Sequence, residues 1–406
     1  MANCTHSNTK NRGLRHFHEP SRITNHQSQA YTLKLETCNL KPETWLAAII
    51  NGQNSAQFPD SEAGWRELQK TAARHGVTAL CHYHLTNTSA KTQCPGWLCD
   101  ALKKSTLQIA ATETILSHEL IKALEELSQA DIQLLLMKGT PLAHSHYPET
   151  YLREKCDTDI LLQDKATAER AWRILEESGY KHRHTLDGDF VGYQYSCFKP
   201  ITQGIIIYID VHIKLNDYIF FAETFDFDEL YSQSIPVPAL GESIQALKPV
   251  HALLLACMHR VAHIPRGEAD RLVWLYDIHL LVNNFSEEEW EEFATLAEEK
   301  NICGSCMDSI EKTKLLFPIN ISKERLQGLI EGAKKERFKP HEKLKRWEYY
   351  YLSLKAVPGF RRKMQLLREH FLPSSNYIME KYQTRNRLLL PFLYVHRVLT
   401  GLKKYF

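Results

Sequence analysis

The amino-acid sequence predicts an α+β protein in which a small mixed β-sheet core lies between helical N- and C-terminal regions. On both sides of the centre, apolar residues recur every three or four positions, which is typical of amphipathic helices. Between these regions, residues 131–216 contain short runs of aliphatic, β-branched and aromatic residues, which are typical of strands. With 406 residues, of which 43% are hydrophobic, the chain is long enough to bury more than one core.

The N-terminal part of the chain changes character near residue 30. Residues 1–30 are polar and rich in His, Asn, Ser and Arg, and so little apolar surface predicts a disordered tail. From "KPETWLAAIIN" onward the apolar spacing is helical. The stretch "WLCDALKKSTLQIAATETILSHELIKALEELSQAD" is predicted to form one long helix or two abutting helices. Residues 31–130 are therefore predicted to be a helical N-terminal region.

The core is predicted to contain about four strands and one helix. "IQLLLMKG" and "DTDILL" are short apolar runs of the kind that form buried strands. "KATAERAWRILEESGY" has the spacing of a short helix that ends at Gly179. "VGYQYSCF" and "GIIIYIDVHIKL", separated by "KPITQ", are predicted to form a hairpin.

Helical spacing returns after the core and continues to the end of the chain. Residues 217–406 are therefore predicted to be a helical C-terminal region, with "PVHALLLACMHRVAHI" and "RGEADRLVWLYDIHLLVNNF" as its clearest helices. The last stretches, "RRKMQLLREH" and "RNRLLLPFLYVHRVLTGLKKYF", are basic and amphipathic. A solvated helix face and a contact with an acidic partner, a nucleic acid or a membrane surface both remain open for them.

Composition and cysteine usage suggest a cytoplasmic protein. The 50 Lys and Arg residues nearly balance the 48 Asp and Glu residues, so the overall charge does not indicate a nucleic-acid binder. The sequence has no apolar signal segment at its start and no stretch of the roughly 20 apolar residues that a membrane span needs. Ten irregularly spaced cysteines suggest free thiols. Cys303 and Cys306 form a CxxC without a second ligand pair, so helix packing is favoured over a metal.

Carboxylates gather on two of the predicted strands. Asp157 and Asp159 are two residues apart, so both side chains should point to the same face of their strand. Asp210 and His212 have the same spacing on another strand. Carboxylate oxygens are the ligands that Mg²⁺ prefers, and three of them can hold a two-metal site. The spacing therefore predicts a site for Mg²⁺ or Mn²⁺ on Asp157, Asp159 and Asp210.

A turn upstream of these carboxylates has features of a phosphate site. Lys138, Gly139 and Thr140 lie between a predicted strand and the helix that follows it. Glycine lets the backbone approach a ligand closely, and a helix N-terminus presents free amides to an anion such as a triphosphate.

Together these motifs resemble the nucleotidyltransferase superfamily with the polymerase-β-type palm. More narrowly, they resemble a poorly characterised bacterial nucleotidyltransferase family with the pattern KG…R…DxD…DxH. The resemblance is clear over about residues 131–216 and looser through about residue 285. The matching residues are Lys138, Gly139, Arg153, Asp157, Asp159, Gly179, Tyr180, Asp210 and His212.

The resemblance implies an activity and a role for each matching residue. The protein would move a nucleoside monophosphate from an NTP to a hydroxyl or phosphate of an acceptor and release pyrophosphate. Asp157 and Asp159 would bind both metals, and Asp210 would bind the catalytic metal and help to deprotonate the acceptor. The nucleotide would be contacted by Lys138, Gly139, Thr140, Arg153 and His212. The acceptor stays open among a protein side chain, a peptide, a sugar or other small molecule, and an RNA end.

Structural interpretations stand beside these roles. Arg153 could pair with Asp157 or Asp159, and His212 could be a core histidine. His259 and His263 are four residues apart on a predicted helix, where packing or lining of the acceptor site is favoured over metal binding. Trp274 and Asp277 are expected to fix a helix against the core.

Two other functions compete with nucleotidyl transfer. A DxD-type glycosyltransferase would need a βαβ nucleotide-binding fold ahead of the DxD, and so parallel strands within residues 31–130. A catalytically silent nucleotide-binding or interaction module would be favoured by the loss of a carboxylate, and all three carboxylates are present.

Overall fold

The structure of the chain, a computed structural model, describes residues 41–53, 58–86, 94–183, 188–202, 204–336, 338, 340 and 346–405. Pro42–Phe406 forms one compact unit. The predicted disordered tail, residues 1–30, lies outside the described residues.

The described part of the N-terminal region consists of helices, as the sequence predicts. The predicted long helix is a single helix, α5. In α3 the local sequence sets both ends: the Ser61 side chain accepts a hydrogen bond from the Gly64 N–H at the start, and Gly76 ends the helix with a φ of 66°. These helices bury a shared core that includes Leu46, Leu80 and Leu98. Their bounds are α2 Pro42–Ile50, α3 Glu62–His75, α4 Thr78–Thr86 and α5 Gly96–Gln129.

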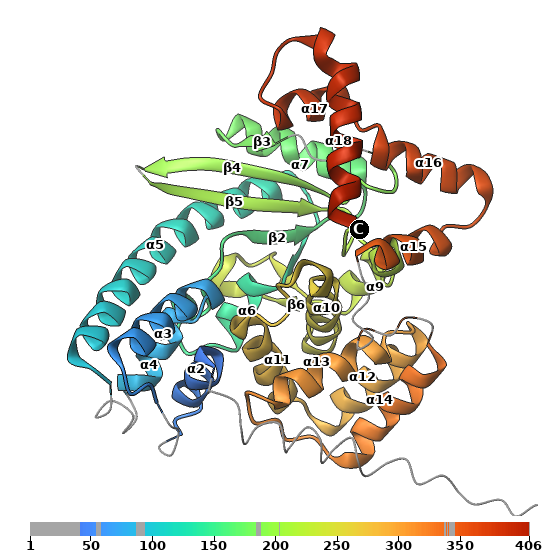
Figure 1. The fold of residues 1–406 in the computed structure, drawn as a ribbon. Helices are drawn as coiled ribbons and strands as arrows, with labels where there is room; N and C mark the ends of the chain where they lie inside the picture. Colours follow the sequence, from blue (N-terminus) through green and yellow to red (C-terminus); the bar gives the residue numbers. More distant parts are fainter. Residues whose placement is uncertain are drawn as a thin grey trace, which may run out of the picture. The chain divides into compact units, whose positions relative to one another are not determined.

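A mixed sheet forms the centre of the molecule, which confirms the predicted α+β class (Figure 1). Within the described residues it has seven strands in the order β3-β4-β5-β2-β1-β7-β6. The pairs β2–β5 and β1–β7 are parallel and the other pairs are antiparallel. The strands are β1 Leu135–Met137, β2 Thr158–Leu161, β3 Lys181–Arg183, β4 Gln194–Thr202, β5 Ile205–His212, β6 Ile235–Pro236 and β7 Gln245–Ala246.

The sheet is larger than the sequence predicts. The four predicted strands are present, but β3 is three residues long and polar, and β6 and β7 are two residues each. Strands this short have no alternation that a sequence can display. The region after residue 217 is helical, as predicted, and within it β6 and β7 add two short strands to the sheet. β4 also continues through "KPIT", past an irregularity between Pro200 and Thr202, so the hairpin turn is shorter than predicted.

The two faces of the sheet pack against different helices. On one face, Ile160, Ile209 and Val211 join the core formed with α5 and α7 (Lys165–Glu177). On the other face, Leu135, Met137 and Leu161 pack toward α10 (Pro249–Ala262). Side chains alternate along a strand, so the immediate neighbours of Ile160, Ile209 and Val211 point to the α10 face. Asp159 on β2, and Asp210 and His212 on β5, are such neighbours.

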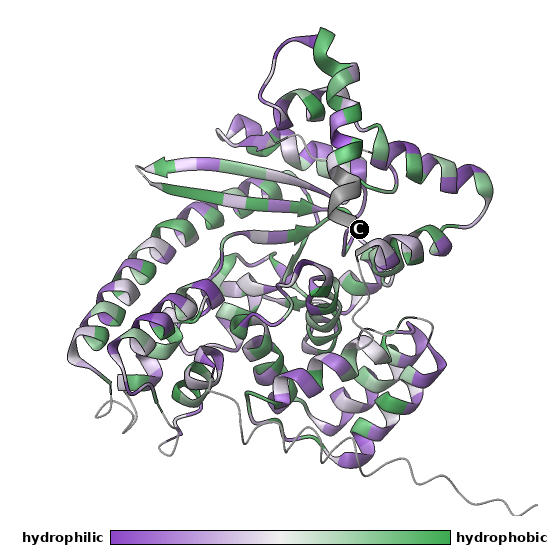
Figure 2. Cartoon of the chain, in the orientation of Figure 1, coloured by the Kyte–Doolittle hydropathy of each residue, from purple (hydrophilic) through white to green (hydrophobic). Residues whose placement is uncertain are grey.

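The remaining helices complete the C-terminal region. In α13 the thiols of Cys303 and Cys306 are buried. Figure 2 shows hydrophobic and hydrophilic bands that alternate along outer helices such as α5 and α16. None of the helices in the described residues is long and apolar enough to span a membrane. The bounds are α6 Gly139–Ser145, α8 Ile219–Ala222, α9 Phe227–Ser232, α11 Leu272–Asn284, α12 Glu287–Glu299, α13 Cys303–Lys314, α14 Lys323–Lys335, α15 Arg346–Ala356, α16 Phe360–Phe371, α17 Ser375–Lys381 and α18 Leu390–Tyr405.

Candidate active site

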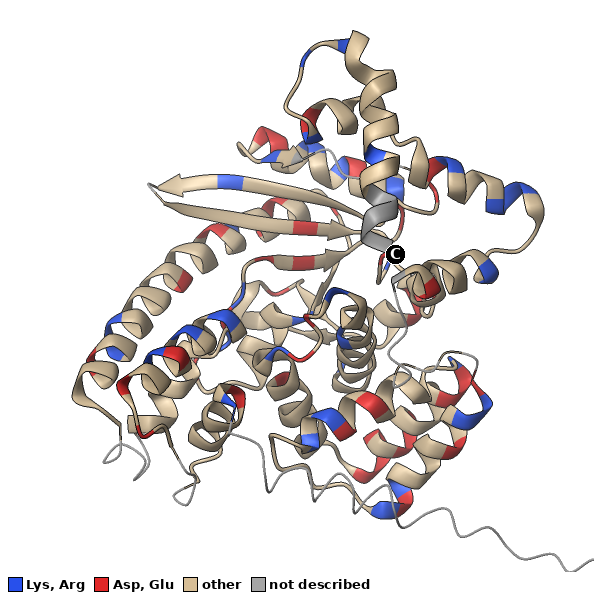
Figure 3. Cartoon of the chain, viewed as in Figure 1, with Lys and Arg blue, Asp and Glu red and all other residues tan. Residues whose placement is uncertain are grey.

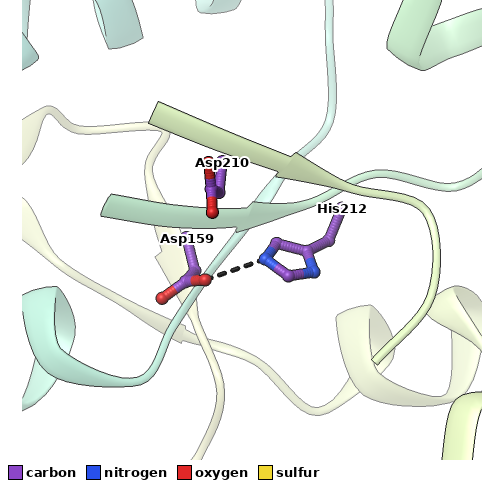
Figure 4. A group of neighbouring side chains, drawn as sticks. All are labelled: Asp159, Asp210 and His212. Atoms are coloured by element: carbon purple, nitrogen blue, oxygen red, sulfur yellow. Dashed lines mark hydrogen bonds and ion pairs between the residues drawn. The ribbon is translucent and has the colours of Figure 1, made fainter. Parts of the chain in front are cut away.

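The parallel pairing of β2 with β5 brings the predicted acidic residues together. Asp159 lies opposite Asp210 in the register, and His212 is two residues further along β5 on the same face. Asp159, Asp210 and His212 each offer one ligand atom, and these atoms all lie within 4.8 Å of one another. Figure 4 shows the three side chains converging from the two adjacent strands. The arrangement can hold a metal ion between strands that are about 50 residues apart in sequence.

Asp159 is the buried carboxylate of this group, and one of its oxygens accepts two hydrogen bonds. Lys138 Nζ donates to Asp159 Oδ1 over 2.6 Å, and His212 Nε2 donates to the same oxygen over 2.8 Å. Burial alone would raise the pKa of the Asp159 carboxyl, but Lys138 and His212 outweigh burial and lower this pKa. Asp159 is therefore a stable anion.

Asp157, directly before β2, is in a different electrostatic position. Asp157 as a whole is exposed to solvent at the mouth of the site, but neighbouring protein atoms keep part of the water away from its carboxyl group. Desolvation and the negative charges of Asp159 and Asp210 raise the pKa of Asp157 to about 6. Asp157 therefore ionises at a cost that a bound cation would remove.

Asp210 is held by two neutral donors from β4. Gln194 Nε2 donates to Asp210 Oδ2 over 2.8 Å, and the Ser196 hydroxyl donates to Oδ1 over 2.6 Å. The sequence interpretation did not single out Gln194 and Ser196. Their spacing of two residues on the strand that pairs with β5 is the signal that would have found them.

Lys138 reaches Asp159 from an unusual backbone conformation. Its φ of 58° with a ψ of −127° lies in a region that residues with a side chain rarely adopt. Such strain persists where the surrounding structure fixes it, and it is concentrated at functional sites.

Arg153 lines the same site and pairs with Asp277 of α11. Its guanidinium donates from Nε and Nη2 to Asp277 over 2.8 to 3.0 Å, and both side chains are only 6% exposed. The Tyr147 hydroxyl donates to the same carboxylate over 2.8 Å. A Cβ at Gly139 would come within 3.1 Å of the Arg153 guanidinium carbon, so glycine leaves room for this packing. The partner of Arg153 is thus Asp277, and neither Asp157 nor Asp159.

Thr140 is directed away from the carboxylates. Its hydroxyl lies 3.1 Å from the hydroxyl of Thr158, and both residues are buried. Thr158 faces away from the two aspartates that flank it, as the alternation predicts. What Thr140 can offer to a phosphate is its backbone, because its side chain is used inside the protein.

A cavity of about 380 Å³ opens in front of these residues. Another part of its wall comes from α10, the residue that follows α10, and α11. There the rings of His259, His263 and Trp274 lie 4.4 to 4.9 Å apart between centroids. Arg271 lies over the Trp274 ring at 5.1 Å. Burial, with the nearby charge of Lys138, lowers the pKa of His259 well below its usual range, so this ring is neutral. The predicted residues that line the cavity are Lys138, Gly139, Arg153, Asp157, Asp159, Asp210 and His212.

Charges around the cavity have both signs. Figure 3 shows acidic residues on the adjacent strands β2 and β5, with basic residues on segments around them. Arg266 pairs with Asp217 at the rim, and Lys138, Arg266 and Arg271 all line the cavity. Such a site can bind an anion that carries its own divalent cation.

Comparison with known proteins identifies a family. The model of a family described as uncharacterised nucleotidyltransferase matches residues 61–318, which include the whole sheet and the cavity residues. In the crystal structure of JHP933 from Helicobacter pylori, 15% of residues are identical, with 60% of this chain and 98% of that chain covered at a TM-score of 0.29. In the crystal structure of a candidate nucleotidyltransferase from H. pylori, 14% of residues are identical, with 56% of this chain and 94% of that chain covered at a TM-score of 0.28. The comparison with curated proteins gives no match.

Proposed function

The chain belongs to the uncharacterised nucleotidyltransferase family, and from this premise we propose that its carboxylate centre transfers a nucleoside monophosphate from an NTP to an acceptor hydroxyl or phosphate and releases pyrophosphate. The observation that carries the proposal is the pairing of Asp159 with Asp210 across two parallel strands, with His212 completing a set of ligand atoms within 4.8 Å. In-line phosphoryl chemistry depends mainly on positioning and charge neutralisation, which such a centre can supply.

The residues present fit a divalent cation. In an octahedral Mg²⁺ or Mn²⁺ site, neighbouring ligand atoms lie about 3 Å apart, so the Asp159, Asp210 and His212 atoms, which lie within 4.8 Å of one another, would draw closer on binding the ion. Asp157 adds a third carboxylate at the cavity mouth, and its raised pKa of about 6 reflects negative charge without a full counter-charge. When bound, the ion would neutralise phosphate charge and activate the acceptor oxygen.

The other residues of the cavity position the reactants. Lys138 brings a positive charge beside Asp159, where it can also meet the phosphates. Gln194 and Ser196 hold both oxygens of Asp210, so this carboxylate faces the acceptor in one orientation. His212 Nε2 is bonded to Asp159, and this nitrogen could bind the ion only by giving up its proton and that bond. We assign Arg153 a positioning role, because its pair with Asp277 fixes the segment that enters β2.

The rings in the cavity wall suit the base of the nucleotide. His259, His263 and Trp274 present neutral or weakly basic rings to the same cavity that Lys138 and Asp159 line. Flat aromatic surfaces of this kind stack on nucleobases with little sequence preference.

The competing functions have less support. A DxD-type glycosyltransferase would need strands ahead of the DxD, and in residues 31–130 the described segments form helices without strands. A catalytically silent module would be expected to have lost a carboxylate, whereas Asp157, Asp159 and Asp210 all border the cavity.

Nucleotide binding and transfer test the proposal directly. Calorimetry with ATP, GTP, CTP and UTP, each with Mg²⁺ and with a chelator, should show metal-dependent binding of at least one NTP. The same NTP labelled at its α-phosphate should then label an acceptor in a cell lysate. No binding of any NTP in the presence of Mg²⁺ or Mn²⁺ would remove the proposal.

A further inference from the structure

A second cavity meets the first at the carboxylates. It has a volume of about 260 Å³ and is lined by Cys156, Asp157, Ser196, Phe198, Tyr208 and Asp210. Asp157 and Asp210 border both cavities. A nucleotide in the first cavity would therefore present its reacting phosphate close to a group held in the second.

The second cavity reaches from the carboxylates to the part of the β4–β5 hairpin that extends past β2. Figure 1 shows this extension of the hairpin. β2 pairs with β5 only from Ile209 onward, so the residue before it, Tyr208, lies beyond the end of that pairing. Phe198 and Tyr208 lie opposite each other across the hairpin, with ring centroids 6.2 Å apart and planes inclined by 31°. Ser196 and Asp210 form the pair two residues further along on the same face. An aromatic pair thus stands beside the pair that carries the carboxylate.

The residues that line the second cavity indicate which kind of ligand it can bind. Two carboxylates and, among the described residues, no lysine or arginine line this cavity, so a phosphate-bearing acceptor would be repelled. A volume of about 260 Å³ is below that of typical drug-sized pockets and suits one ring-sized group. Two cross-strand pairs that follow each other on the same face of a hairpin lie about 6.6 to 6.8 Å apart. This is roughly the distance from a phenol ring packed on the aromatic pair, through the phenol hydroxyl, to a carboxylate that accepts its hydrogen bond.

We propose that this second cavity is the acceptor site and that it takes a phenolic hydroxyl, with the ring packed on Phe198 and Tyr208 and the oxygen directed at Asp210. The inference rests on the proposed function and narrows its acceptor from a hydroxyl or phosphate to a phenol. The phenolic oxygen forms a bond to the α-phosphorus of the NTP, and the bond from that phosphorus to the oxygen bridging to the β-phosphate breaks. Pyrophosphate leaves with the electron pair of that bond, and the phenolic proton passes to the Asp210 carboxylate and on to water.

Defined small acceptors test this assignment in the full-length protein. N-acetyl-tyrosinamide, phenol, N-acetyl-serinamide and a short RNA with a free 3′-hydroxyl are each incubated with α-phosphate-labelled NTP and Mg²⁺. We expect labelled products from the two phenols and at least about tenfold less from the serine amide and the RNA, because in these the hydroxyl is not carried by an aromatic ring. A tyrosinamide rate about tenfold above phenol indicates a peptide source of the phenol, and equal rates indicate a small-molecule source.

Variants of the aromatic pair complete the test. Phe198→Ala should lower transfer to N-acetyl-tyrosinamide by about tenfold, with NTP affinity measured by calorimetry kept. Phe198→Leu is the second variant if the alanine protein does not fold, and Phe392→Ala is the matched control, because Phe392 is 68% exposed on α18 and lines neither cavity.

Three results would overturn the inference. They are wild-type transfer by both folded Phe198 variants, transfer to the serine amide or RNA at the phenol rate, and bound NTP without transfer to either phenol. The proposed function survives each of these, because NTP binding is measured separately. No NTP binding would remove both.

Discussion

The two aspartates of the DxD have opposite effects on the stability of the protein without metal. Asp159 is buried and bonded to Lys138 and His212, whereas Asp157 faces Asp159 and Asp210 without a cation bonded to it in the described residues. The sequence predicts that the two carboxylates share a face. It does not show that one is paired and the other is not, because Lys138 and His212 reach Asp159 from 21 and 53 residues away.

Exchanging each aspartate for asparagine should separate these roles. Asp157→Asn should raise the melting temperature of the metal-free protein, because it removes a carboxylate that ionises at a cost. The pKa of Asp157 is raised from 3.8 to about 6, so the cost is absent below pH 3.8, grows as pH rises and is complete above about pH 6. Thermal melts should therefore show a gain for Asp157→Asn near pH 7 that disappears near pH 4.

Asp159→Asn should behave in the opposite way. It leaves Lys138 and His212 beside a neutral group, and breaking a buried ion pair costs about 3 to 5 kcal/mol. Since the pKa of Asp159 is lowered, its stabilising effect is present above the unfolded-state value and is lost only as the pH falls below it. The deficit should persist from about pH 7 to about pH 5. A melting temperature for Asp159→Asn above that of the wild type would contradict this account.

Gly139 packs so closely against the Arg153 guanidinium that a side chain has little room there. Gly139→Ala would place a Cβ 3.1 to 3.2 Å from the Arg153 guanidinium, which is held by Asp277 and cannot easily retreat. We expect a loss of about 1 to 3 kcal/mol in the free energy of unfolding. Gly328→Ala is the control, because no atom lies within 4 Å of a Cβ there and the residue is in α14. Denaturant titration should show no loss for that control, and equal effects of both changes would refute the close packing.

At the scale of elements, the register of β2 and β5 determines the site. Their parallel pairing is what aligns Asp159 with Asp210, and β4 then supplies Gln194 and Ser196. The sequence predicts these strands because their apolar runs are long enough to be recognised. It does not predict β3, β6 and β7, or which strands are neighbours, because pairing depends on contacts between distant residues.

Arg153 and Asp277 join the segment before β2 to α11, and their separation of 124 residues hides the pair in the sequence. Arg153→Met should lower the free energy of unfolding by about 3 to 5 kcal/mol, because Asp277 is left buried without its cation. Adding Asp277→Leu should restore part of this loss, with a coupling of about 1 kcal/mol or more in a double-mutant cycle.

A surface arginine provides the matched control for this prediction. Arg66→Met removes an exposed pair with Glu62 and should change stability by less than about 1 kcal/mol. If Arg153→Met instead leaves stability unchanged and only weakens NTP binding, Arg153 contacts phosphate and its positioning role is wrong.

At the scale of the whole molecule, the C-terminal helices reach the site region. Glu369 of α16 accepts hydrogen bonds from the backbone N–H groups of Asp189, Phe190 and Val191, over 2.8 to 3.3 Å. This loop leads directly to Tyr193 and Gln194, which line the first cavity. The sequence predicts basic amphipathic helices here but not this contact, because an acid in a basic stretch carries no sign of its partner.

Glu369→Ala should therefore affect both stability and the site. Removing the acceptor for three N–H groups should cost about 1 to 3 kcal/mol, and the rate of transfer should fall because Gln194 is held less firmly. Glu298→Ala, which breaks an ion pair whose partners are 61% and 71% exposed, should do neither. Unchanged melting and transfer in Glu369→Ala would show that the C-terminal helices do not support the site.

Nucleotide transfer by the carboxylate centre is tested most directly by Asp210→Asn. Asp210 lies on β5, opposite Asp159, and borders both cavities, so it should act on the acceptor more than on the nucleotide. Calorimetry should show NTP affinity close to that of the wild type, while pyrophosphate release in the presence of acceptor should fall by at least about 100-fold. Wild-type pyrophosphate release by Asp210→Asn would contradict the assignment of this centre.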